Sequence, residues 1–177
     1  MKLSKSTCIW AVVLAFFLYV MAEAGEEPKR VADMKEEWGE ETEGYTISIA
    51  TDKENYLPGE MITLSVKLKN MSEGDTKILL VAKFASYQIE VVLPTREQAP
   101  LTLYGKKMLE ASQSFVRAVV PLKAGEEIGT SFNLNRFFDM TLSGEYRISV
   151  SRKVWERDNI EKTATVNSNT VVVVINE

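Results

Sequence analysis

Residues 62–69 read Ile-Thr-Leu-Ser-Val-Lys-Leu-Lys, with an apolar side chain at every second position. Successive side chains of a β-strand point to opposite faces, so this spacing predicts a strand with one buried and one solvated face. A helix would repeat its apolar residues every three or four positions instead. The stretch 45–49 alternates in the same way, with Thr46 and Ser48 expected on its solvated face. Both stretches therefore favour a β-rich domain.

Further short strands are expected along the chain, separated by turn signals. They are predicted at 77–82, 87–93, 101–104, 114–122, 127–134, 145–152 and 170–175. Helical turns are expected only at 106–111 and 136–141. The nearly continuous apolar run 171–174 is expected to be covered on both faces, because an exposed strand of that kind invites aggregation. This pattern predicts an all-β fold, an antiparallel Ig-like β-sandwich of roughly seven to nine strands.

The N-terminal 24 residues are typical of a secretory signal peptide. Lys2 and Lys5 precede an uncharged apolar run at 9–21, and Ala22-Glu23-Ala24 supplies the small residues of a cleavage site. An uncleaved anchor is the alternative, although the run is shorter than the roughly 20 apolar residues that span a bilayer. We expect an exported protein, periplasmic or extracellular, with no membrane contact after cleavage.

Residues 25–43 are rich in glutamate and are expected to form a flexible acidic linker before a single folded domain at 44–177. The 177-residue chain contains no histidine, and its one cysteine, Cys8, lies in the predicted signal. A Ser-His-Asp or Cys-His catalytic arrangement and a histidine-ligated metal site are therefore excluded. We expect no enzyme activity, cofactor or metal. The net charge of −4 also argues against nucleic acid as a partner.

Two local patterns resemble known folds. Thr51-Asp52-Lys53, followed by Tyr56 and Pro58-Gly59-Glu60, is similar to the opening of macroglobulin-type and related bacterial Ig-like domains. In those domains a tyrosine packs at a strand end and a Pro-Gly turn starts the next strand. In the turn, Pro58 presets φ and Gly59 accepts the positive φ that follows.

The second pattern, Asp139 with Gly144 and Tyr146, resembles the corner before the penultimate strand of Ig-like sandwiches, where a tyrosine closes the core. Asp139 is expected to cap its turn by accepting backbone N–H bonds. Residues 45–177 as a whole resemble an uncharacterised family of secreted bacterial Ig-like domains. The matching positions are Leu101-Thr102, Tyr104-Gly105, Leu134-Asn135-Arg136 with Asp139, Gly144-Glu145-Tyr146 and Ser168-Asn169-Thr170. A weaker likeness, carried by the Pro-Gly-Glu turn and the strand spacing, is to the intracellular proteinase inhibitor family.

Two segments are candidate partner-binding sites. In the first, a charged inter-strand loop at 152–162, Trp155 would act as an anchor among Arg152, Lys153 and Arg157. The alternative is that Trp155 folds back over the end of the domain.

The second candidate is the long connection at 94–113, in which Tyr104, Lys106, Lys107 and Met108 would contact a partner. Packing across an open end of the sandwich is the alternative. One carboxylate pair, Asp139 and Glu145, flanks a common turn and is more simply explained by turn structure than by catalysis. The aromatic residues Phe132, Phe137, Phe138 and Tyr146 are assigned to the core.

These observations favour an exported, non-enzymatic β-sandwich that binds a protein partner through its inter-strand connections. A protease inhibitor of the same architecture is the first alternative. A carbohydrate-binding module or a purely structural envelope domain is the second.

Overall fold

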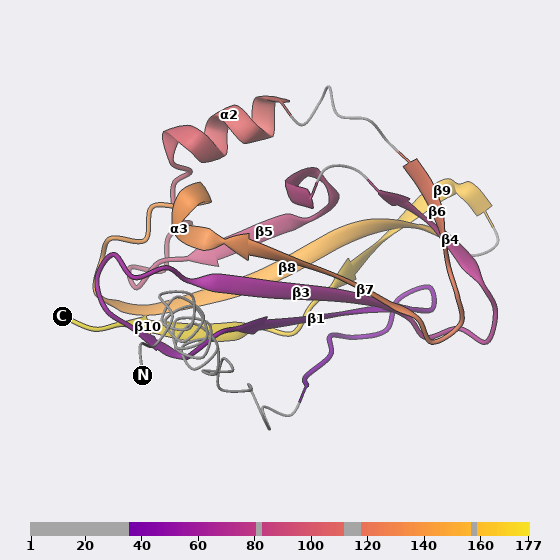
Figure 1. Cartoon of the computed structure of the whole chain (residues 1–177), viewed down its shortest axis with the longest axis horizontal. Coiled ribbons are helices and arrows are strands. Elements are labelled where there is room, and N and C mark those ends of the chain that lie inside the picture. Colours follow the sequence, from indigo (N-terminus) through magenta and orange to yellow (C-terminus); the bar gives the residue numbers. More distant parts are fainter. Residues whose placement is uncertain (1–35, 81–82, 112–117, 157–158) are drawn as a thin grey trace, which may run out of the picture. The chain divides into compact units, whose positions relative to one another are not determined.

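The computed structural model describes residues 36–80, 83–111, 118–156 and 159–177, and these form an all-β unit (Figure 1). One sheet has the strand order β1-β3-β7, with bounds Tyr45–Thr51, Thr63–Asn70 and Glu127–Asn133. The second has the order β2-β10-β8-β5, with bounds Asn55–Tyr56, Val171–Ile175, Gly144–Glu156 and Gln88–Val92, and β9 (Asn159–Asn167) also pairs with β8. Strands β4 (Thr76–Leu80) and β6 (Ala118–Leu122) pair with each other as a separate two-stranded ribbon. The pairs are antiparallel except that of β2 with β10.

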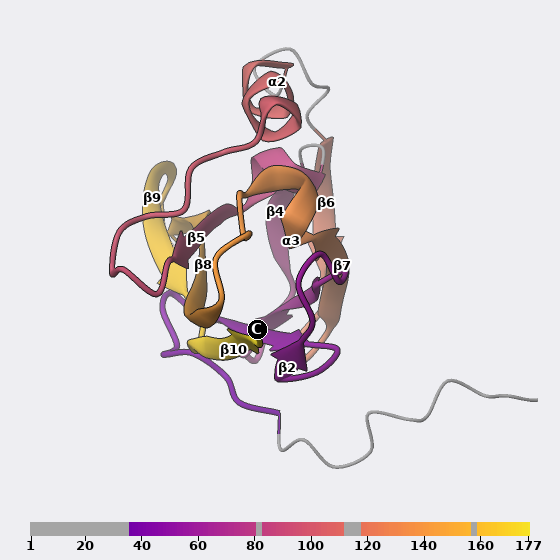
Figure 2. The ribbon, with the colours of Figure 1, turned by 90° about the vertical axis from the view of Figure 1, so that its left-hand side faces the viewer.

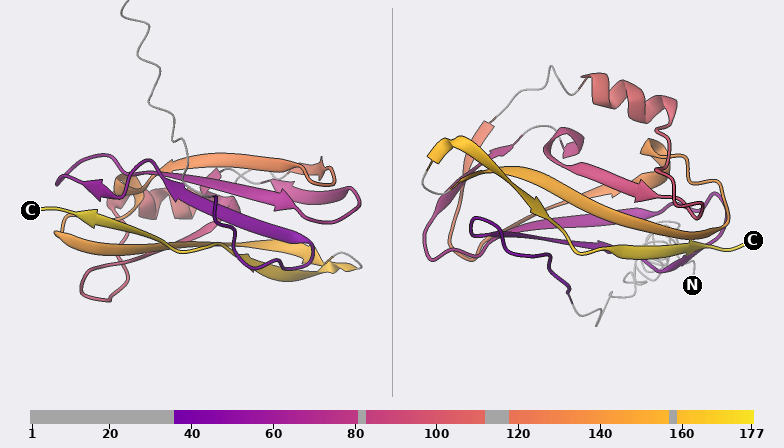
Figure 3. Two further views of the ribbon diagram at one scale, coloured as in Figure 1. Left: turned by 90° about the horizontal axis from the view of Figure 1, so that it is seen from below. Right: turned by 180° about the vertical axis from the view of Figure 1, so that it is seen from behind.

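The two larger sheets lie one above the other and bury their facing side chains (Figure 3, left). In β3 the predicted alternation is confirmed, because Leu64, Val66 and Leu68 are buried while Ser65 and Lys67 are exposed. The facing strand β8 contributes Tyr146, Ile148 and Val150 in the same alternating way. The aromatic residues assigned to the core are all buried: Phe132, Phe137, Phe138 and Tyr146. Hydrophobic burial between two sheets is thus the main stabilising term.

Strand β1 is buried on both faces, which corrects the expected solvated face of Thr46 and Ser48. Part of the predicted linker explains this: the Gly39 amide donates to the Ile47 carbonyl at 2.9 Å, and the Thr46 hydroxyl donates to the Gly39 carbonyl at 2.8 Å. A Cβ at Gly39 would lie 2.1 Å from the carbonyl oxygen of Asn167, so only glycine fits there. The folded unit therefore begins at Glu36 rather than at residue 44.

The same edge of β1 meets the connection between β9 and β10. Ile47 forms a parallel bridge with Ser168. The Asn169 side chain accepts from the Ile49 amide at 2.8 Å and donates to the Ile49 carbonyl at 3.0 Å, as a neighbouring strand would. These bonds satisfy backbone groups that an open edge strand would leave exposed.

Buried Asn70 holds the corner where β3 turns into β4 and β6 turns into β7. Its Nδ2 donates to the carbonyls of Gly74 (2.9 Å), Leu122 (3.1 Å) and Lys123 (3.0 Å), and its Oδ1 accepts from the Ser72 amide at 3.0 Å. One amide side chain therefore replaces the ladder bonds that the sheet loses at this bend.

Two predictions about regular structure were wrong. The stretch 101–104 forms only a single bridge, from Leu101 to Phe138, before the chain enters helix α2 (Leu103–Ala111), which includes the helical turn expected at 106–111. The charged loop expected at 152–162 is a hairpin in which β8 runs on to Glu156 and β9 begins at Asn159. Along this part of β8, Val154 is buried while its neighbour Lys153 is exposed, so a charged residue here lines the solvated face of a strand.

Smaller differences concern the C-terminal strand and a second helix. In β10 Val173 is buried while Val172 is 40% exposed, so the apolar run is covered on one face, not two. Its edges are nevertheless paired, since β10 lies between β2 and β8. The helical turn predicted at 136–141 lies earlier, as α3 (Leu134–Phe137), and a 3-10 turn η1 occupies Lys83–Ser86. The predicted signal peptide, 1–24, lies outside the described residues.

Candidate functional site

Helix α2 lies outside the two sheets, beside α3 and η1 (Figure 2). Thr102 caps its first turn, because the Thr102 Oγ1 accepts from the Gly105 amide at 3.0 Å. The same hydroxyl donates to the Arg136 carbonyl at 2.5 Å, which ties the start of α2 to α3. A Cβ at Gly105 would lie 2.4 Å from the Phe137 carbonyl oxygen. The helix can therefore lie this close to α3 only because residue 105 is glycine. Both contacts hold α2 in one position.

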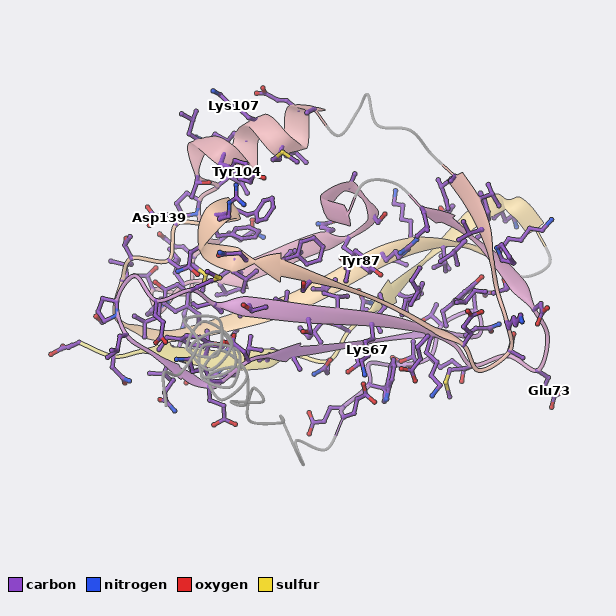
Figure 4. All side chains as sticks on the ribbon, viewed as in Figure 1. Lys67, Glu73, Tyr87, Tyr104, Lys107 and Asp139 are labelled. Atoms are coloured by element: carbon purple, nitrogen blue, oxygen red, sulfur yellow. The ribbon has the colours of Figure 1, made fainter. Side chains whose placement is uncertain are left out.

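The outer side of α2 carries exposed apolar and basic residues. Leu103 is 70% exposed and Leu109 is 51% exposed. Lys106 and Lys107 are exposed, and neither takes part in the ion pairs of the described residues. Figure 4 shows Lys107 pointing away from the domain. Met108, which was predicted to contact a partner, is half-buried against the core and lies on the same side of the helix as Gly105.

Tyr104 joins this surface to α3. Its ring packs edge-on against Phe137 at 5.3 Å between centroids, and the Arg136 guanidinium lies 4.4 Å from its centroid. A cation over an aromatic face is stabilising, and here it also holds the ring in one orientation. We name the set Leu103, Tyr104, Lys106, Lys107, Leu109 and Arg136 the α2 surface. Arg136 could not be predicted as part of this surface from the sequence, because its place there depends on the packing of α3 against α2.

The other predicted site is not a single surface. Side chains of β8 alternate, so Arg152 is buried between the sheets while Lys153 is exposed and Trp155 is half-buried on the opposite face. Arg157 lies outside the described residues. The β8–β9 hairpin and α2 lie at different ends of the sheets (Figure 1 and Figure 3, right). The structure therefore does not bring the two predicted sites together.

The first predicted structural motif is found as expected. Tyr56 is buried, and its hydroxyl donates to Asp52 Oδ1 at 2.8 Å while accepting the Lys53 amide at 3.1 Å. Burial, and then the bond to Asp52, raises the pKa of the Tyr56 phenol. Gly59 has φ +77°, the conformation expected after Pro58. An ion pair with Lys53 lowers the pKa of Glu60 at the end of this turn.

The second motif is found with one correction. Tyr146 is fully buried, and its hydroxyl donates to the Leu142 carbonyl at 2.7 Å, closing the end of the core. Burial raises the pKa of this phenol. Gly144 has φ +129° and leaves room for Pro94, whose carbons lie 2.9 Å from the position of a Cβ. Asp139 accepts the Thr141 hydroxyl at 2.8 Å rather than the expected backbone N–H bonds.

The carboxylates near this turn have separate partners. Glu145 pairs with Arg147 at 3.1 Å on the solvated face of β8, and Asp139 bonds Thr141. Among the described residues, no group of three acidic, cysteine or histidine side chains could hold a metal ion. Within the same residues, no helix has the length and apolar character needed to cross a membrane.

The described architecture is that of an all-β protein with a helix fixed on its surface. No family model and no curated protein matches the chain. Among solved structures it is similar to the ApaA protein of Bordetella pertussis, with a TM-score of 0.43, 9% identity, and coverage of 79% of this chain and 96% of that one.

It is also similar to parts of two enzymes. One is a β-glucosidase from Listeria innocua, with a TM-score of 0.38, 15% identity, and coverage of 75% of this chain but 16% of the enzyme. The other is the alkylpurine DNA glycosylase AlkC from Pseudomonas fluorescens, with a TM-score of 0.38, 14% identity, and coverage of 74% and 30%. At these TM-scores none of the similarities assigns a family or an activity to the chain.

Proposed function

We propose that this protein is an exported, non-enzymatic Ig-like β-sandwich whose α2 surface binds a protein partner. The observation that carries the proposal is that one helix exposes two leucines, a tyrosine and two lysines, and that these lysines take no part in the ion pairs of the described residues. Exposed apolar groups next to cations are the usual composition of a protein-binding patch, in which aromatic and arginine side chains supply most of the energy.

Rigidity supports the same proposal. Binding to a preformed surface avoids the entropy cost of ordering a loop, which is about 0.5–1.5 kcal/mol for each flexible side chain that becomes fixed. The Thr102 cap and the close approach of Gly105 to Phe137 hold α2 in place before any partner arrives. The lysines favour a partner with acidic residues, because opposite charges speed association.

A site-specific crosslinking experiment tests this proposal. A photoreactive amino acid is placed at Leu103 and, as the control, at Leu57, an exposed leucine on the β2–β3 turn. Both proteins are irradiated in an extract of the source cells, and the products are identified by mass spectrometry. We expect one protein to be captured from position 103 and not from position 57.

The charge-reversed double variant Lys106→Glu/Lys107→Glu should lose that product without a change in melting temperature, because both side chains are exposed. The matched control is charge reversal at Lys123, an exposed lysine in the turn between β6 and β7. Identical products from positions 103 and 57, or a product unaffected by the double variant, would show that the α2 surface is not the binding site.

A further inference from the structure

Arg152 is a charged residue whose side chain lies in an apolar environment. It continues the inward-facing series of β8, after Tyr146, Ile148 and Val150, and is only 4% exposed. A guanidinium stays protonated in proteins, so burial cannot be relieved by losing the charge. An arginine at this position therefore needs compensating partners.

The partners that the described residues supply are incomplete. Arg152 Nη2 donates to the Leu79 carbonyl of β4 at 2.7 Å, and the guanidinium carbon lies 4.9 Å from the centroid of the Tyr87 ring. Nη1 is shielded from solvent and has no hydrogen-bond partner among the described residues. A buried donor without an acceptor is costly, and a buried cation without a counter-charge is more so.

No described carboxylate supplies the missing charge. The ion pairs of the described residues engage other cations, namely Lys53, Lys67, Lys69 and Arg147. The contact with Tyr87 offsets part of the cost, since an aromatic face attracts a cation. A neutral ring and one carbonyl still leave the formal charge without a counter-ion.

A second unpartnered polar group faces the same interior from the other sheet. Thr130 pairs in register with Val66 on β3, a buried inward-facing residue, and Thr130 Oγ1 is buried without a hydrogen-bond partner. Phe132, the next inward residue of β7, packs edge-on against Tyr87 at 6.2 Å between centroids. Tyr87 and Phe132 thus connect the guanidinium to the strand that carries the hydroxyl.

We propose that Arg152 Nη1 binds the carboxylate of an organic acid between the two sheets, with Thr130 as a second donor and the rings of Tyr87 and Phe132 against its apolar part. A carboxylate is the group that matches this set, because its single negative charge balances one guanidinium and its oxygens accept from few donors. A phosphate dianion would need more cations than the described interior provides. The carboxylate belongs to a free acid or to the C-terminus of a peptide.

Access to Nη1 passes the β4–β6 ribbon, since β4 supplies the Leu79 carbonyl that bonds Arg152. The ribbon packs on the core through Ile78 and Leu122, so the ligand reaches Nη1 only when the ribbon moves away from β8. The site is separate from the α2 surface.

Thermal unfolding of the full chain tests the proposal, with sodium butyrate as the probe and sodium chloride at equal ionic strength as the reference. A ligand that binds only the folded state raises the melting temperature, by roughly 3–6 °C at about ten times its Kd. We expect such a saturable rise in the wild type and in Arg147→Met, an exposed arginine on the same strand. Arg152→Met should show no rise. It should otherwise fold, because methionine retains the apolar stem of the side chain.

The same thermal unfolding experiment with peptides distinguishes a free acid from a peptide C-terminus as the source of the carboxylate. An alanine-rich pentapeptide with a free C-terminus is compared with its amidated form. A rise with butyrate alone identifies a free acid, and a rise with only the free-carboxylate peptide identifies a peptide C-terminus. Equal rises in wild type and Arg152→Met, or no rise with any carboxylate, overturn the proposal.

A measurement on the wild type keeps the test valid if Arg152→Met does not fold. The NMR signal of the Arg152 Nε–H should shift saturably with butyrate and not with chloride. A signal that does not move overturns the proposal. Lys106→Glu/Lys107→Glu should keep the carboxylate response, so failure of this site and failure of the α2 surface are distinguishable.

Discussion

Replacing Asn70 by alanine should destabilise the protein by about 2–4 kcal/mol. The substitution removes the donor shared by the carbonyls of Gly74, Leu122 and Lys123. The bond to Leu122 is fully buried, so its carbonyl is left unsatisfied at a cost of about 1–3 kcal/mol. The other bonds are partly buried, and water replaces them in part, so together they add about 1 kcal/mol.

Urea unfolding followed by circular dichroism measures this loss, with thermal unfolding as a second readout. For a folded unit of this size, 1 kcal/mol corresponds to roughly 2–4 °C, so the melting temperature should fall by roughly 4–16 °C. Asn55→Ala is the matched control, since Asn55 is exposed, and it should stay within about 0.5 kcal/mol of the wild type. Asn70→Asp should be worse than Asn70→Ala, because a carboxylate would face the same carbonyls.

A small effect of Asn70→Ala would refute this reasoning. A loss under about 1 kcal/mol would mean that water enters the corner and satisfies the Leu122 carbonyl. The slope of the unfolding free energy against urea must be unchanged in the comparison, because a changed slope reports a different unfolded or native state.

Three further predictions concern the edges of the fold. Gly39→Ala should release residues 36–43 from β1, because the added Cβ would overlap the Asn167 carbonyl. Limited proteolysis should then cut within residues 36–43 faster than in the wild type, and equal cutting rates would contradict the prediction. Tyr146→Phe should cost about 1 kcal/mol in urea unfolding, because it removes the bond to the Leu142 carbonyl, and no loss would show that the bond is neutral. The raised pKa of Tyr56 means that the unfolded state loses this proton first as pH rises. Stability should therefore be intact below about pH 10 and fall above it, by up to about 1.4 kcal/mol per pH unit. Tyr56→Phe should flatten this alkaline decline, and an unchanged slope would assign it to other groups.

Much of the fold could be predicted from local pattern. The alternation in 62–69 identified β3 and its buried face, since a strand with one wet side must alternate. The Pro58-Gly59 turn was identified because glycine tolerates the positive φ that it adopts. The charged stretch that forms the β8–β9 hairpin was predicted to be a loop, because charged and polar residues are common both in loops and on the solvated face of a strand.

The candidate site could be predicted only in part. The connection 94–113 was identified by its length, and Tyr104, Lys106 and Lys107 within it are exposed on α2. Met108 was assigned to the same surface, but the helix turns it toward the core. Arg152 was read as an exposed cation, although the alternation of β8 places it between the sheets.

The sequence by itself determined the β-rich class, the aromatic core and the turn geometry at Gly59, because these follow from periodicity, burial and backbone sterics over a few residues. The tertiary structure alone decided where glutamate-rich residues 36–43 lie, which face of α2 is exposed and what surrounds Arg152. Each of these depends on contacts between segments far apart in the chain. The close approach of Gly39 to Asn167 is one such contact, and no local pattern encodes it.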